Sequence, residues 1–302
     1  MSRLVALMSD GIARICRDSA FITCFDELEQ VRRQATRTFL RRMFNVTAIL
    51  ALIVITLIAI GWWPLAIPAF FVPFVFALTF ASASLREMTD LYKAPLLAFL
   101  ADALGLNYRD SGASPPTFEE TREAIFPLCR ESAARAEDRF EGCDAEDSPF
   151  DFWQARLAEP LSRGSYERFF GRFYAFARRT GRTEVIVAPA GHSFGRSGPR
   201  REQVRIRDDP RFAWRFKVYA TDPAEARRLL DADKRTLLRR LRRRGPLYFH
   251  LRPDTVLVGV SGRGFRAGSM FRPLTAAQRL GKLGDDLVRA IALQEELIAR
   301  LG

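Results

Sequence analysis

The sequence predicts an α+β protein in which a two-helix transmembrane hairpin is followed by a cytoplasmic antiparallel sheet packed with helices. Three observations lead to this prediction: an uncharged apolar run, a series of short segments with strand periodicity, and a C-terminal segment with one apolar helical face. They divide the chain into an N-terminal cytoplasmic helical segment (1–43), the hairpin (44–85), a helical stalk and linker region (86–165) and a cytoplasmic α+β domain (166–302).

The apolar run at residues 44–85 contains no charged side chain, although 27% of the chain is charged. One helix through it would be about 60 Å long, roughly twice the thickness of the hydrocarbon core, so two spans fit better. The break is expected at Gly61, Trp62, Trp63 and Pro64, because glycine weakens a helix, proline can start one, and tryptophan suits a headgroup boundary. A re-entrant hairpin is the competing geometry, and the length of each half argues against it.

Positive charges flank this run on one side of the expected bilayer. Arg37, Arg41 and Arg42 precede the first span and Arg86 follows the second, whereas the turn between the spans carries no charge. Because Lys and Arg are retained on the cytoplasmic side, both termini are expected in the cytoplasm, with two spans in a bacterial inner (plasma) membrane. A secretory signal peptide is disfavoured, since the apolar run starts far from the N-terminus and exceeds the length of a signal core.

After residue 166 the sequence alternates between strand and helix patterns. The predicted strands are residues 166–176, 183–187, 204–207, 212–219, 247–251, 255–260 and 265–271, of which the first two and the fifth and sixth form hairpins. One helix is predicted over residues 222–244, with Asp222 as N-cap and Pro223 in its first turn. The last helix is predicted to begin at Thr275 and to cover one side of the sheet.

Residues that carry chemistry show no recognisable catalytic pattern. His192 and His250 have no neighbouring HExxH motif or cysteine pair. The cysteines are too widely spaced for a CxxC motif, which fits reduced thiols in a cytosol: Cys16, Cys24, Cys129 and Cys143. The sequence therefore predicts no catalytic residue, no metal site and no cofactor.

The positive charge of the soluble part is concentrated in residues 196–244, which hold seventeen Lys and Arg against seven Asp and Glu in a chain of net charge +12. On the helix predicted there, leucines are expected to dock on the sheet and to leave a ridge of arginines outside. The ridge consists of Arg228, Arg235, Arg239, Arg242 and Arg243. It is a candidate surface for anionic lipid or for an unidentified protein partner, and the alternative is a solvated face of an arginine-rich chain. Nucleic acid is disfavoured, since an anchored protein already has anionic headgroups within reach.

Two motifs carry a family resemblance. Residues 169–173 read Phe-Phe-Gly-Arg-Phe, and residues 218–227 read Val-Tyr-x-x-Asp-Pro-x-Glu-Ala-Arg. With the apolar pair and the closing helix, they resemble a bacterial two-span inner-membrane family known only as domain of unknown function 3137. The resemblance covers most of the chain after the first helical segment. It implies the membrane-anchored α+β architecture and transfers no catalytic residue, because that family has no established activity.

Three classes of function remain open. The preferred class is a non-enzymatic, membrane-anchored cytoplasmic binding or scaffold module, because folding and anchoring explain every strong signal. The second is a membrane-bound enzyme that acts on a lipid headgroup or another anionic substrate, which a deep pocket with convergent polar groups would distinguish. The third is a subunit of an oligomeric transport assembly, which ranks last because neither span contains an ionisable residue to line a pathway.

Overall fold

The computed structural model describes residues 2–110, 115–127, 129, 134–144, 146–160, 165–178, 182–192, 202–265 and 274–302. The chain divides into two compact units. The helical unit holds residues 2–103 and 266–285, and the sheet unit holds residues 104–265 and 286–302. The predicted α+β class, with an antiparallel sheet packed with helices, is confirmed.

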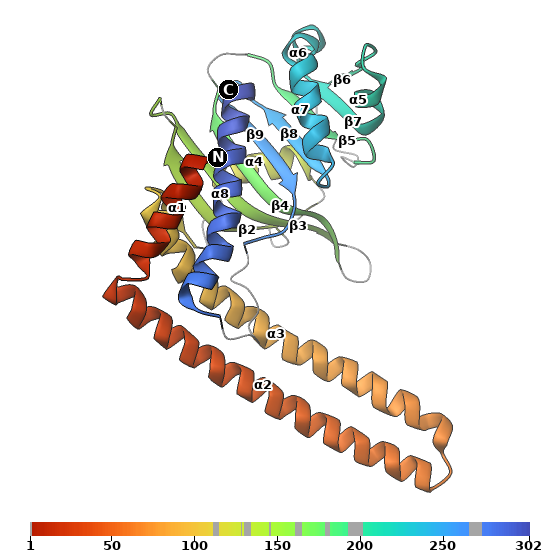
Figure 1. Cartoon of the computed structure of the whole chain (residues 1–302). Helices are drawn as coiled ribbons and strands as arrows, with labels where there is room; N and C mark the ends of the chain where they lie inside the picture. Colours follow the sequence, from red (N-terminus) through yellow and green to blue (C-terminus); the bar gives the residue numbers. More distant parts are fainter. Residues whose placement is uncertain are drawn as a thin grey trace. The chain divides into compact units, whose positions relative to one another are not determined.

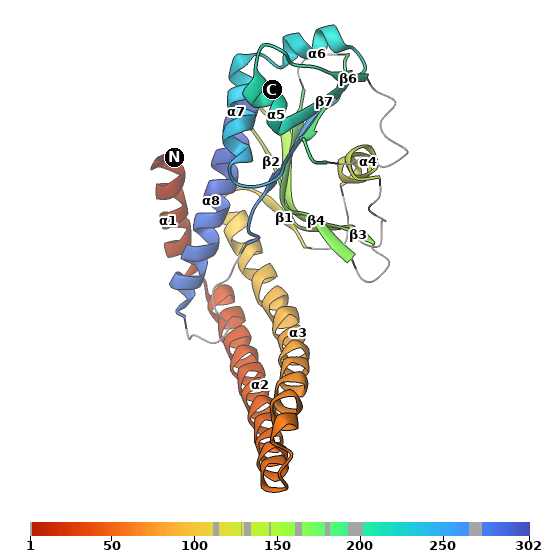
Figure 2. The same cartoon turned by 90° about the vertical axis from the view of Figure 1, so that its right-hand side faces the viewer.

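Two long helices dominate the helical unit. Helix α1 spans Ser2–Ile15, α2 spans Ser19–Ala59 and α3 spans Trp63–Ala103. Asp18 starts α2 by accepting a hydrogen bond from the Ala20 N–H. The turn after α2 contains Gly61 with φ of +82°, a conformation that side chains with a Cβ rarely adopt. Helices α2 and α3 then run side by side over most of their length (Figures 1 and 2).

Within the described residues, α2 is the one helix shown to be long and apolar enough to cross a membrane. The second span of the predicted transmembrane hairpin is not shown: α3 is a continuous helix, but the side chains of residues 79–91 lie outside the described part. The predicted flanking residues on α2 are exposed ahead of its apolar part, and Trp62 is exposed in the turn. They are Arg37, Arg41 and Arg42. The side chains of Trp63 and Arg86 lie outside the described residues.

The helical unit has a small core at its base, the end where the beginning of α2 meets the end of α3. Phe21 of α2 is 1% exposed and meets the edge of Phe99 on α3, with ring centroids 5.1 Å apart. Helix α1 packs against α3 and against the beginning of α8 (Ala276–Leu301), where Gly284 lies against Met8. The N-terminal helix is therefore an integral part of this unit.

A buried carboxylate joins three helices at this base. Glu29 on α2 accepts hydrogen bonds from the Tyr92 hydroxyl on α3 at 2.7 Å and from the Arg279 Nε on α8 at 3.2 Å. Its second oxygen accepts from the Arg32 Nε at 2.8 Å. Burial opposes ionisation of Glu29, but the hydrogen bonds from Tyr92 and Arg32 and the two guanidinium charges outweigh it, so the pKa of this carboxyl is lowered.

Within its described residues, the sheet unit holds a nine-stranded, fully antiparallel sheet in the order β1-β2-β3-β4-β9-β8-β5-β7-β6. The strands are β1 (Asn107–Arg109), β2 (Ala134–Cys143), β3 (Pro149–Pro160), β4 (Ser165–Ala177), β5 (Val185–Pro189), β6 (Glu202–Val204), β7 (Phe216–Ala220), β8 (Leu247–Leu251) and β9 (Thr255–Ser261). The other helices of this unit are α4 (Pro116–Ile125), α5 (Pro210–Arg215), α6 (Pro223–Leu229) and α7 (Ala232–Arg242).

Helices cover both faces of the sheet. Helix α4 lies on one face, and α7 with the later part of α8 lies on the other (Figure 2). Alternate strand residues feed a core beneath α4, in which Phe118 meets Trp153 and Phe173 at centroid distances of 6.3 and 6.1 Å. Intervening residues such as Phe152 and Tyr174 point to the opposite face and are also buried.

The sheet begins earlier in the chain than the sequence predicted. Residues 86–165 include the end of α3 and all of α4, but they also supply β1, β2 and β3, which a helical stalk and linker does not predict. The acidic residues of β2 resemble a solvated loop in sequence, but Asp138 is 1% exposed and accepts a hydrogen bond from the Tyr108 hydroxyl at 3.0 Å. Pairing with neighbouring strands thus overrode the local composition.

The elements after residue 166 also differ in part. The predicted hairpin of residues 166–176 and 183–187 is wrong, because β4 pairs with β3 and β9, and β5 pairs with β7 and β8. The predicted strand over residues 212–219 is helix α5 followed by β7, and the helix over residues 222–244 is α6 and α7. The hairpin of β8 and β9 and the last helix are confirmed, while residues 266–271 of the last predicted strand lie outside the described residues.

The Phe-Phe-Gly-Arg-Phe motif has a packing reason. Gly171 of β4 pairs with Ser261 of β9, and a Cβ at this glycine would lie 2.2 Å from the Val260 carbonyl oxygen. The two strand backbones therefore approach in a way that only glycine permits.

Replacing Gly171 with Ala is expected to lower the free energy of unfolding by about 1–3 kcal/mol, because the added methyl must displace backbone. The measurement is the urea unfolding midpoint of the full chain in a neutral detergent. Gly262→Ala is the matched control, since a Cβ there meets open space. Equal midpoints for the two variants would contradict this account.

Replacing Glu29 with Ala is expected to cost about 3–5 kcal/mol, because it leaves buried Arg32 and Arg279 without their shared carboxylate. Thermal unfolding of the full chain measures this effect. Glu27→Ala changes an exposed carboxylate on the same helix and should have little effect. Similar losses for both variants would show that Glu29 has no special role.

Candidate functional site

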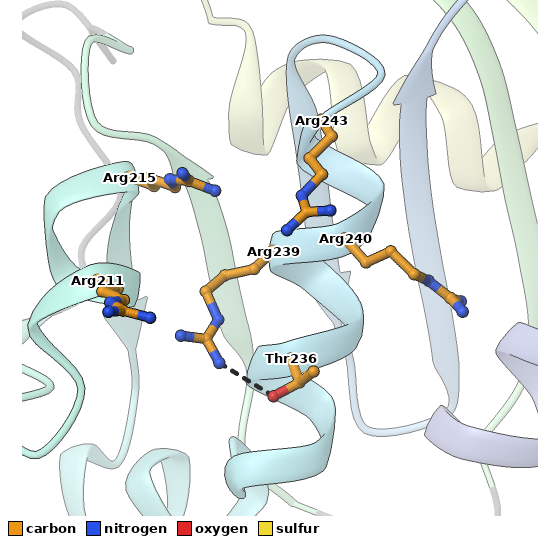
Figure 3. A pocket seen from close by; sticks show the side chains of 6 residues that line it. All are labelled: Arg211, Arg215, Thr236, Arg239, Arg240 and Arg243. Atoms are coloured by element: carbon orange, nitrogen blue, oxygen red, sulfur yellow. Dashed lines mark hydrogen bonds between the residues drawn. The ribbon is translucent and has the colours of Figure 1, made fainter.

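An arginine-lined pocket lies between α5 and α7 (Figure 3). Its volume is about 410 Å³. Arg211 and Arg215 line it from α5, and residues of α7 and its C-cap line the other side: Thr236, Arg239, Arg240 and Arg243. We call this set the arginine pocket.

The α5 side of the arginine pocket is set by local sequence. Asp209 caps the helix by accepting a hydrogen bond from the Phe212 N–H at 2.9 Å, and a proline follows at the first helical position. Phe212 is fully buried and its ring lies 4.8 Å from that of Phe216. Arg211 and Arg215 are four residues apart, so they share a helix face, and both line the pocket.

The α7 side follows from amphipathic spacing. Asp231 caps this helix by accepting from the Lys234 N–H at 2.8 Å, so a new helix begins where α6 has ended. Leu237, Leu238 and Leu241 are buried on the sheet side. The pocket residues recur at intervals of three and four and therefore form the opposite face.

The charges of the arginine pocket are only partly compensated. Arg239 lies 3.3 Å from a carboxylate oxygen of Asp209 and donates to Thr236 Oγ1 at 3.0 Å. Arg240 forms an ion pair with Glu296 of α8. Across the described ranges, Arg211, Arg215 and Arg243 have no ion pair with a carboxylate.

The lining supports binding rather than bond making. The guanidinium groups of Arg211, Arg215 and Arg243 supply convergent, permanently charged donors for a phosphate or carboxylate. The lining residues that the structure describes include five arginines and one threonine, with no carboxylate, histidine or cysteine that could act as a base or nucleophile. The pocket is therefore a candidate anion-binding site.

The predicted arginine ridge is divided by the structure. Arg239 and Arg243 line the pocket, whereas Arg228 lies on α6 and Arg235 forms an ion pair with Asp208 at 2.7 Å. Arg242 is partly buried, and its Nε has no hydrogen-bond partner among the described residues. Binding of lipid or a partner by these residues stays a prediction.

Sequence reasoning missed Arg211 and Arg215 as members of the same site. The signal for these two residues was the Asp-Pro pair at residues 209–210, which marks the start of a helix in the same way as residues 222–223 do. The alternating aromatic residues that follow favoured a strand instead, so α5 was not expected.

The two histidines lie under α4. His250 lies 2.6 Å from Glu184 Oε1 and 3.4 Å from Thr121 Oγ1, an order of groups that resembles a catalytic triad. Thr121 is 1% exposed, so a substrate cannot reach its hydroxyl. His192 contacts the Ile125 carbonyl oxygen at 2.6 Å. Both histidines therefore fasten α4 to the sheet.

A second, more open cavity of about 890 Å³ lies beside β2 and β3. Asp151 lines it and accepts two hydrogen bonds from Arg139, at 2.8 and 3.1 Å. Burial outweighs that guanidinium and raises the pKa of Asp151 to about 6. Across the described ranges, no cluster of three or more His, Cys, Asp or Glu side chains is placed to hold a metal ion.

Buried His192 gives the fold a pH dependence. Burial lowers the pKa of His192 below the 6.5 of a free side chain, so the unfolded chain takes up a proton first. The stability contributed by neutral His192 is complete above that value and is lost as the pH falls through the folded pKa. His192→Gln should remove this loss. The slope of the free energy of unfolding against pH, on the acid side, should then decrease by at most about 1.4 kcal/mol per pH unit. Urea unfolding at a series of pH values measures it, and parallel profiles for wild type and variant would rule it out.

Three comparisons with known proteins place limits on identity. No curated protein matches the chain. Among solved structures, the crystal structure of the mycobacterial trehalose monomycolate transport factor A, TtfA, is similar at 14% identity and a TM-score of 0.38, over 64% of this chain and 93% of that one. A likeness of this degree does not extend that protein's role to this chain. Residues 169–298, which include both motifs and the arginine pocket, match the model of the family described as protein of unknown function (DUF3137).

Proposed function

We propose that this chain is a membrane-anchored, non-enzymatic binding module that holds an anionic group in the arginine pocket. The observation that carries the proposal is the convergence of Arg211, Arg215 and Arg243, three guanidinium groups with no carboxylate partner in the described residues, on one concave site. These positively charged groups repel one another, so their proximity does not stabilise the fold. A bound anion would reduce the repulsion.

In this proposal, α2 and α3 each cross a bacterial inner membrane, and both termini lie in the cytoplasm. Large apolar side chains are exposed on both helices, which a soluble surface rarely tolerates over such a length. They include Ile49, Leu52 and Ile55 on α2 and Phe71, Val72 and Val75 on α3, each at least 55% exposed. The arginines before residue 44 support the orientation.

An enzymatic function is the second candidate, and Asp151 is the observation that favours it. A carboxyl group with a pKa of about 6 beside an open cavity is a common feature of general acids and bases. However, Asp151 is held by two hydrogen bonds from Arg139, which fits a structural ion pair equally well. Function as a subunit of an oligomeric transport assembly has no supporting observation in the described residues.

Inorganic phosphate should bind to the full chain in a neutral detergent, and Arg243→Glu should weaken that binding about tenfold or more. A hydrogen bond to a charged group contributes about 1.5–3 kcal/mol, and each 1.4 kcal/mol is a factor of ten. Isothermal titration calorimetry measures the affinity. Arg227→Glu makes the same charge change at an exposed position of α6 outside the pocket and should leave it unchanged. Equal weakening by both variants would mean that net charge, rather than the pocket, attracts phosphate.

A further inference from the structure

We propose that the anion of the arginine pocket is the phosphate of phospholipid headgroups, and that this face docks on an anionic bilayer with Trp214 as its interfacial anchor. The inference rests on the proposed function and deepens it by naming the ligand class and a further contact residue.

The exposed side chain of Trp214 is the first observation that supports this inference. It lies on α5 between Arg211 and Arg215, and 79% of it is exposed to solvent. Phe212, two residues earlier, supplies the buried anchor of the same short helix. The fold therefore does not require the indole ring, and α5 holds its largest side chain in solvent beside the pocket.

The combination of side chains on α5 matches the chemistry of a bilayer surface. An indole ring is apolar over most of its area and carries one N–H donor, so it is stabilised at the level of the headgroups. Arginine binds phosphate through two parallel hydrogen bonds. Trp214 is three residues from Arg211, so these two side chains are neighbours on the surface of α5, and the ring and that guanidinium group can meet one surface together.

Charge complementarity favours lipid over a soluble anion or a protein. Each arginine near an anionic bilayer strengthens binding about fivefold, and three uncompensated arginines together give about a hundredfold. The apolar segment of α2 gives the same chain a second attachment to a bilayer, which raises the effective concentration of headgroups for a weak second site. A soluble phosphate would use the pocket but would leave Trp214 without a role.

The test uses the full chain with Trp62→Phe and Trp63→Phe, reconstituted in vesicles that contain phosphatidylcholine brominated on its acyl chains. Two tryptophans then remain, fully buried Trp153 and exposed Trp214. Bromine quenches indole fluorescence at short range. When the vesicles also contain phosphatidylglycerol, the fluorescence of Trp214 should be quenched. When they contain phosphatidylcholine alone, the quenching should be several-fold weaker. Adding Trp214→Phe gives the baseline from Trp153.

Matched variants test the arginines. Arg243→Gln should weaken docking about fivefold, seen as a higher phosphatidylglycerol content at half-maximal quenching, and Arg227→Gln should not. Both positions are exposed, so neither change threatens the fold.

The outcomes separate this inference from the proposed function. Phosphate binding that depends on Arg243, together with unquenched Trp214 in anionic vesicles, would overturn lipid docking and leave anion binding in place. Loss of both signals would overturn both. A specific protein crosslinked through position 214 in native membranes, with no quenching by lipid, would overturn lipid docking in favour of a protein partner.

Discussion

The carboxylate of Glu29 is the constraint on which the helical unit depends. Its partners Tyr92 and Arg279 are 63 and 250 residues away in sequence, so one buried group fixes the first long helix, the second long helix and the closing helix. Arg279 is fully buried and also lies over the Tyr92 ring, at 4.7 Å from its centroid. Burying a guanidinium group without this carboxylate would cost several kcal/mol. Glu29 therefore supplies a counter-charge at the beginning of α8.

The same chain leaves other arginines without such compensation. Arg279, Arg235 and Arg240 have carboxylate partners, whereas three arginines of the pocket have none among the residues that the structure describes. The contrast shows that an excess of arginine in the composition does not by itself create a site. A site arises where helices place several guanidinium groups on one concave surface and the nearest carboxylates are already engaged, as Asp209 is in capping α5.

Sequence reasoning predicted the elements whose signals are local. The strands of the β8 and β9 hairpin alternate and are bounded by turn residues, and the last helix keeps its apolar residues on one side, so both were predictable. Strand pairing was not, because the paired residues of β4 and β9 are 78 to 90 positions apart and no local pattern encodes that register. The cluster around Glu29 was not predictable either, because nothing in the sequence of a charged helix indicates which of its glutamates is buried. Of the pocket lining, the predicted ridge includes Arg239 and Arg243, because α7 is regular, whereas Arg211 and Arg215 depended on recognising a six-residue helix.

The two outermost strands of the sheet, β1 and β6, are each three residues long. Each of these two strands therefore offers few backbone groups to a strand of a neighbouring molecule. Recognition by strand addition, a common way for binding domains to capture extended peptides, is therefore disfavoured at the ends of this sheet. The proposed recognition by side chains of α5 and α7 makes no use of backbone groups in β1 or β6.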